Sequence, residues 1–174
     1  MQNRLERYPQ VTEANVRRAL TQSLLLIEAD AKVNVRQDTR RLAGSINHQI
    51  TGAFPDLVGR VGPSVKYGAV VEFGRRPGSR MPPVDALLGW VRRHFSPGAT
   101  AVAAGPARGR AWRAAGEHAL RSRAFALARA IARRGIPARP FLVPAYRKNQ
   151  PAIEALFAQV GVRLTAYLAG GPPL

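Results

Sequence analysis

The chain of 174 residues contains no cysteine. Disulfides, thiolate metal sites and cysteine nucleophiles are therefore excluded, and this absence fits a reducing compartment. The sequence also lacks any run of about 18 consecutive apolar residues, which a membrane-spanning helix needs. Its first ten residues, MQNRLERYPQ, contain no apolar signal core. We therefore expect a soluble protein that is made in the cytoplasm.

Acidic residues are scarce: 10 Asp and Glu stand against 27 Lys and Arg, giving a formal net charge of +17. Lysine is scarce too, so nearly all of the positive charge is arginine. Arginine binds phosphate and carboxylate groups bidentately, and a charge this high favours an anionic partner, usually nucleic acid. The alternative is the codon bias of a GC-rich genome, which would enrich arginine, alanine, glycine and proline together.

Groups of residues that could carry out catalysis are also missing. The three histidines, His48, His94 and His118, lie in different predicted elements and form no metal-binding pair. Glu28 and Asp30 are the only acids close together, and their i, i+2 spacing places them on different faces of a helix. Neither a GxSxG motif nor a Walker-type loop occurs. We therefore predict a non-enzymatic protein without catalytic, metal-binding or cofactor-binding residues.

Hydrophobic periodicity and turn residues divide the chain into helices and strands. Helices are predicted at residues 11–35, 84–95 and 111–134, and from Pro151 onward. Strands are predicted at residues 45–51, 57–61 and 65–73, with an extended edge segment at 136–143. Short turns between the three strands favour an antiparallel meander.

These elements predict an α+β fold. An antiparallel meander of three to four strands would pack against two long helices, with shorter helices beside them. We expect a single domain over residues 1–174, with a flexible loop at 96–110 and a loose C-terminal tail at 169–174. Helix-turn-helix, zinc-finger and aromatic RNA-binding signatures are absent, so any contact with nucleic acid would be independent of base sequence.

Three segments, in order, carry a resemblance to a known family. They are DTRRLAGSI at residues 38–46, VGPSVKYGAVVEFGRRP at 61–77 and IPARPFLVPAYRKN at 136–149. They resemble the small minor tail or tail-completion proteins of long-tailed bacteriophages, whose patterns read TG-L--SI, Y---VEFG and -A-PFL-PA. The matching residues are Thr39, Leu42, Ser45, Ile46, Tyr67, Val71, Glu72, Phe73, Gly74, Ala138, Pro140, Phe141, Leu142, Pro144 and Ala145. Arg40 departs from the pattern, since it stands where the family has glycine.

This resemblance implies a structural virion protein at the neck, where the phage head joins the tail. Such a protein would form part of a ring, commonly six-fold, around the channel that carries the genome, and would contact other neck, connector and tail proteins. A tail-terminator ring or a head-side connector ring is an alternative within the same class. A stand-alone basic protein that binds nucleic acid without sequence specificity is the alternative from another class.

Glu72 ends the predicted strand 65–73 and precedes a run of arginines. A carboxylate that is partly buried needs a partner. We therefore predict a structural ion pair between Glu72 and Arg139, with Arg75 as second choice. This pair would hold the proline-rich segment beside the third strand.

Other residues of the matching segments are candidates for contacts in an assembly. Tyr67 and Phe73 are expected in the core, with a subunit contact as the alternative, and Phe141 is a further candidate for a subunit contact. An exposed basic loop is predicted to face DNA or a neighbouring ring through Arg75, Arg76 and Arg80.

Overall fold

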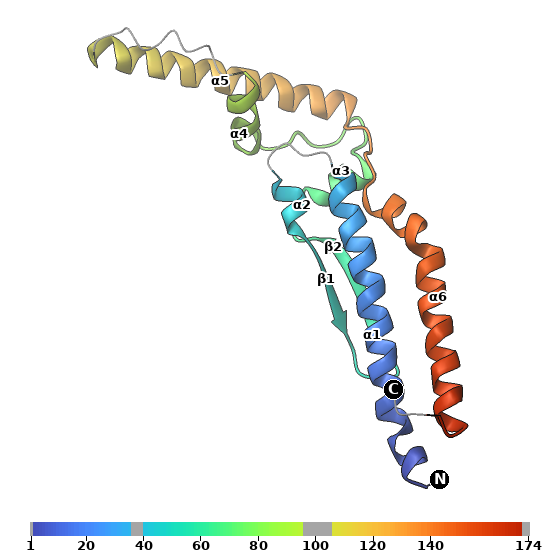
Figure 1. The fold of residues 1–174 in the computed structure, drawn as a ribbon. Helices are drawn as coiled ribbons and strands as arrows, with labels where there is room; N and C mark the ends of the chain where they lie inside the picture. Colours follow the sequence, from blue (N-terminus) through green and yellow to red (C-terminus); the bar gives the residue numbers. More distant parts are fainter. Residues whose placement is uncertain (1, 36–39, 96–105, 172–174) are drawn as a thin grey trace. The chain divides into compact units, whose positions relative to one another are not determined.

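The computed structural model describes residues 2–35, 40–95 and 106–171. Within these ranges the chain forms six helices and one two-stranded antiparallel sheet (Figure 1). The order is α1 (Gln2–Asn34), α2 (Arg41–Ser45), β1 (Ile46–Thr51), β2 (Val58–Pro63), α3 (Gly68–Phe73), α4 (Val84–His94), α5 (Pro106–Arg134) and α6 (Leu142–Leu168). The mixed helical and strand composition agrees with the predicted α+β class.

The chain divides into two compact units. Unit 1 comprises Met1–Phe73 and Arg139–Leu174, and unit 2 comprises Gly74–Ala138. The expectation of a single domain over residues 1–174 stays a prediction.

Unit 1 is built on α1 and α6, which lie side by side and run in opposite directions (Figure 1). The hairpin of β1 and β2 packs on α1, with Ile46 paired to Pro63 at one end and Thr51 to Val58 at the other. Gly59 allows this close approach, since a Cβ there would lie 2.9 Å from side-chain atoms of both Leu20 and Leu24.

The main core of unit 1 joins residues that are far apart in the sequence. Its buried members come from α1, from the α2–β1 segment and from the start of α6: Ala31, Val35, Leu42, Ala43, Ile46, Phe141 and Ala145. A second, smaller cluster lies further along the helix pair and centres on Ala19, Val160 and Leu164. Burial of these apolar side chains is the main force that holds the two long helices and the hairpin together.

The predicted third strand is wrong, because residues 68–73 form the helix α3. Alternation placed Tyr67 and Phe73 in the core, but these side chains are 43% and 75% exposed. The buried residues are Gly68 and Glu72, which are four residues apart and so share one helix face. Tertiary contacts at these two positions outweigh the strand preference of the valines. The sheet therefore has two strands among the described residues, not three to four.

The predicted edge strand at 136–143 and the predicted helix start at Pro151 are wrong as well. Ile136 makes one isolated bridge with Arg75, and α6 already begins at Leu142. Pro151 lies inside α6, although a proline in a helix removes one backbone hydrogen bond. The early start of α6 depends on a hydrogen-bond acceptor from another part of the chain, the carboxylate of Glu72.

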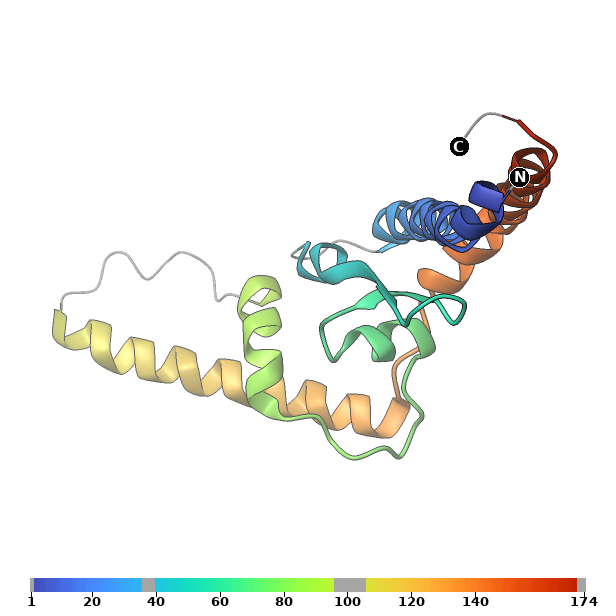
Figure 2. The same cartoon turned by 90° about the horizontal axis from the view of Figure 1, so that it is seen from below.

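Unit 2 consists of α4 packed on α5 (Figure 2). Its core contains Val91, Leu120 and Ala124. Gly74 and Gly135 each have a positive φ angle of 74°, a conformation that favours glycine. Beside them, the backbones of Arg75 and Ile136 exchange two hydrogen bonds of 2.8 and 2.9 Å.

The predicted loop at 96–110 is only partly covered by the structure. Residues 96–105 lie outside the described ranges, whereas residues 106–110 are the first turns of α5, so this part of the loop prediction is wrong. Residues 172–174 of the expected tail also lie outside the described ranges. Among the described helices, none is both long and apolar enough to span a membrane.

Candidate functional site

Unit 1 contains a buried carboxylate, Glu72, which is 3% exposed. Its Oε2 accepts hydrogen bonds from the backbone N–H groups of Phe141 at 2.7 Å and Leu142 at 3.0 Å. Its Oε1 accepts a third bond from the N–H of Val143 at 3.0 Å. The first N–H groups of a helix have no partner within the helix, and they carry partial positive charge. Glu72 therefore caps α6 from a distant part of the chain.

This geometry corrects the predicted partner of Glu72. Among the described residues, no ion pair joins Glu72 to Arg139 or to Arg75, and the Arg139 side chain is exposed. The backbone N–H of Arg139 instead donates to the carbonyl of Val71 at 2.8 Å. The proline-rich segment is held beside α3, but through backbone groups and not through a guanidinium.

Parts of the three family-like segments pack together in unit 1. Leu42 and Ile46 of the first segment share the main core with Phe141 and Ala145 of the third. The second segment supplies Glu72, whose hydrogen bonds reach residues 141–143 of the third. Thr39, which matches the threonine of the first pattern, lies outside the described residues. Part of each pattern thus lies in or beside the main core, whereas Tyr67 and Phe73 are exposed and Gly74 and Ala138 belong to unit 2.

The candidate subunit contacts separate into exposed and buried residues. Tyr67 and Phe73 are exposed on unit 1, and their proposed contact role stays a prediction. Phe141 is 1% exposed and belongs to the main core, so its assignment as a subunit contact is wrong. Its ring is already packed inside its own chain.

The candidate basic loop lies in unit 2. Arg76 and Arg80 are exposed, whereas Arg75 is partly buried. The Arg75 guanidinium donates to the backbone carbonyl of Arg80, which holds the loop in a closed turn. The predicted contact of these arginines with DNA or a neighbouring ring stays a prediction.

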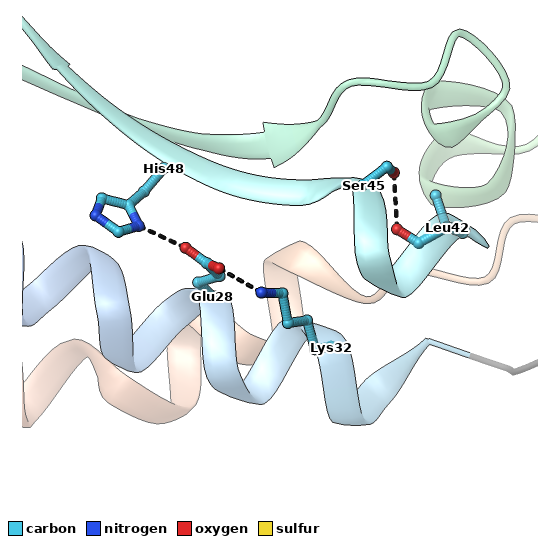
Figure 3. A network of polar contacts seen from close by, with 5 residues as sticks. All are labelled: Glu28, Lys32, Leu42, Ser45 and His48. Carbon is cyan, nitrogen blue, oxygen red and sulfur yellow. Dashed lines mark hydrogen bonds and ion pairs between the residues drawn. The ribbon is translucent and has the colours of Figure 1, made fainter. Parts of the chain in front are cut away.

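A polar network that the sequence did not predict joins α1 to β1. Figure 3 shows Glu28 between Lys32 and His48, and the His48 Nδ1 lies 2.5 Å from the Glu28 Oε2. The hydrogen bonds from Lys32 and then from His48 hold the pKa of Glu28 below its ordinary value of 4.5. In the same view, the Ser45 hydroxyl donates to the Leu42 carbonyl at 2.7 Å.

Asp30 forms the corresponding link between α1 and α6. Its two carboxylate oxygens accept from Lys148 Nζ at 2.9 Å and from Asn149 Nδ2 at 2.5 Å. The hydrogen bond from Lys148, followed by that from Asn149, lowers the pKa of Asp30. Glu28 and Asp30 therefore serve different neighbours, as their i, i+2 spacing indicated.

These pKa shifts predict that unit 1 loses stability in acid. Glu28 is ionised more readily when folded than when unfolded, so its contribution is complete above pH 4.5 and is lost as the pH falls through the lowered folded pKa. Urea unfolding from neutral pH down to strongly acidic pH should show a shallower loss of stability in Glu28→Gln than in the wild-type protein. Glu154→Gln, whose carboxylate accepts from the neutral amide of Gln150, is the control and should keep the wild-type slope. Equal slopes in all three proteins would contradict the assignment.

In the described part of the chain, no group of three or more His, Asp or Glu side chains is arranged to hold a metal ion. The polar centres described above connect elements of unit 1 to one another. Comparison with known proteins adds no assignment: no family model, curated protein or solved structure matches this chain.

Proposed function

We propose that this protein is a structural component of the neck or tail top of a long-tailed bacteriophage. It would form part of a ring that joins head to tail and surrounds the DNA channel. The observation that carries this proposal is that the first and third family-like segments share the main core, while Glu72 of the second segment caps the helix of the third.

This packing matters because the segments are separated in the sequence. A fold shared with the family would bring its three patterns together in space. In unit 1, Leu42 and Phe141 share one core, and Glu72 caps the helix that follows Phe141. This arrangement supports the resemblance as a description of one folded unit.

The surface of unit 1 is compatible with assembly. Phe73 is 75% exposed and Tyr67 is 43% exposed, on and just before the same short helix. A closed ring uses head-to-tail contacts between different surfaces of neighbouring subunits, and an exposed aromatic side chain is typical of such contacts. The net charge of +17 suits sequence-independent contact with the phosphates of a genome in transit.

The decisive experiment is electron microscopy of lysates from a phage in which this gene is deleted. A neck protein predicts full heads and finished tails that remain unattached, with joining restored by the wild-type gene. Tails of uncontrolled length would favour a tail-terminator ring, because a terminator stops tail growth. Intact, infectious particles would contradict the proposal and favour the stand-alone basic protein.

Complementation with variants tests the proposed contact. Tyr67→Ala/Phe73→Ala should leave folding intact, because both side chains are exposed, but should reduce the yield of joined particles. The matched control is Val162→Ala, which removes a 69% exposed apolar side chain from α6 and should assemble normally. If the double variant joins heads to tails as efficiently as the control does, these residues are not the contact.

A further inference from the structure

A polar groove follows the seam between α1 and α6 in unit 1. One cavity of about 290 Å³ is lined by both helices, and an adjoining cavity of about 410 Å³ is lined by α1. Asn15 and Arg18 line both cavities, so the two cavities adjoin. We name this feature the seam groove.

Two arginine–glutamine pairs line the first cavity. Arg18 and Gln22 on α1 are four residues apart, as are Gln159 and Arg163 on α6. Residues at this spacing lie on one face of a helix. Because α1 and α6 are neighbours, two guanidinium and two amide groups are available around the same space. Arg7 continues the row of cations in the second cavity.

These arginines are not neutralised within the chain. Among the described residues, Arg7, Arg18 and Arg163 have no ion-pair or hydrogen-bond partner for their guanidinium groups, and no carboxylate lines either cavity. Glu13, on the same helix, is paired with Arg17 at 2.8 Å. Arg7, Arg18 and Arg163 are exposed and carry like charges, so this surface is complementary to an anion.

The floor of the groove carries an unpaired polar atom. Asn15 is 4% exposed, and its Nδ2 donates to the Val11 carbonyl at 2.8 Å. Its buried Oδ1 has no hydrogen-bond partner in the described part of the chain. Buried polar atoms in folded proteins are normally paired, and an exception marks a place where water or a ligand supplies the partner. The first cavity is therefore lined by buried Asn15, by Ala19 and Val160 of the second core cluster, and by exposed arginine and glutamine side chains.

The arrangement favours a polymer with repeated anionic groups. Arg7 and Arg18 are separated by eleven residues of one helix, which corresponds to about 16 Å at 1.5 Å per residue. A single small anion cannot span that length, whereas a nucleic-acid backbone presents phosphates along it. Guanidinium groups bind phosphate bidentately, and amide side chains commonly bond to phosphate and sugar oxygens.

We propose that the seam groove binds the phosphate backbone of duplex DNA without reading its sequence. No aromatic side chain lines either cavity, so the stacking platform that single-stranded nucleic acid requires is absent from the lining. This inference does not depend on the proposed neck function, since a neck protein need not bind DNA as an isolated chain. It differs from the prediction for Arg75, Arg76 and Arg80, which lie in unit 2.

The test is fluorescence anisotropy of a labelled duplex with the full purified chain over a series of salt concentrations. Wild-type protein should bind with a micromolar dissociation constant near physiological salt, as is typical of non-specific binding. In Arg18→Gln/Arg163→Gln, the slope of log K against log salt should become shallower by about 2, because each lost phosphate contact changes it by about 0.9. Arg18→Lys/Arg163→Lys retains the charge and should recover most of that slope.

The control is Arg129→Gln/Arg133→Gln, two exposed arginines four residues apart on α5. It removes the same charge and should leave most of the slope and affinity unchanged. Equal losses in the two double variants would overturn the proposal, since they would reflect net charge alone. Absence of duplex binding by the wild-type protein, tighter binding of single strands, or stronger competition by polyglutamate than by DNA would also overturn it. None of these results decides the neck proposal, which is tested by the phenotype of the gene deletion.

Discussion

Glu72→Ala is expected to lower the free energy of unfolding of unit 1 by about 3–5 kcal/mol. The substitution removes the acceptor of three backbone hydrogen bonds, at 2.7, 3.0 and 3.0 Å. An acceptor lost from a buried donor costs about 1–3 kcal/mol, because the donor stays desolvated without a partner. The N–H of Phe141 is buried and those of Leu142 and Val143 are partly buried, so the three costs fall toward the lower part of that range.

The measurement is urea unfolding followed by circular dichroism, with hydrogen exchange of the amides at residues 141–143. Their exchange should accelerate in Glu72→Ala. Glu72→Gln should fall between the alanine variant and wild type, because an amide keeps one acceptor oxygen but turns an NH₂ group toward an N–H donor.

Glu13→Ala is the matched control for Glu72. Glu13 is half-buried and forms an i, i+4 pair with Arg17, so its removal should cost about 0.5 kcal/mol. A Glu72→Ala variant that unfolds at the same urea concentration as Glu13→Ala would contradict the capping role.

Local signals in the sequence were sufficient for several elements. The stripe of Leu20, Leu24 and Ile27 predicted α1, and the turn at Gly52 predicted the hairpin. These patterns are local, since each depends on residues within a few turns or across one short loop. The bounds were less accurate: α1 begins at Gln2 and α5 at Pro106.

Elements that depend on distant contacts were missed. The segment 65–73 alternates like a strand, but Gly68 lies against Pro63, and a Cβ at Gly68 would come within 2.3 Å of the Pro63 side chain. Glu72 likewise bonds to residues 69 to 71 positions away in the chain. No local pattern reports either contact, so both the helix α3 and the early start of α6 were outside what periodicity could predict.

At the candidate site, the sequence likewise identified the residue but not its partner. The sequence indicated Glu72 as a structural carboxylate because it is a lone acid in a chain rich in arginine. The partner was wrong, since backbone N–H groups occur at nearly every residue and leave no trace in the sequence. The link from Glu28 to His48 was missed for a related reason: it depends on the hairpin lying on α1.

Phe141→Ala is expected to destabilise unit 1 by about 3–5 kcal/mol, the usual range for removing a buried phenylalanine ring. Phe141 is 1% exposed and packs with Ile46 and Ala145 in the main core. Its loss leaves a cavity at the point where α6 begins and where Glu72 caps the helix. Domains are stable by only about 5–15 kcal/mol, so the variant should approach the threshold of unfolding at room temperature.

Phe73→Ala provides the contrast, since it removes the same ring from a site that is 75% exposed. Its effect on unfolding should stay within about 0.5 kcal/mol, as is usual for surface substitutions. Urea unfolding of the two variants, measured side by side, tests whether Phe141 is buried and Phe73 is exposed. Alternation along residues 65–73 had predicted that Phe73 is buried. Equal destabilisation would contradict the exposed position of Phe73. A stable Phe73→Ala that also fails to join heads to tails would assign the exposed ring to assembly, since its folding role would already be excluded.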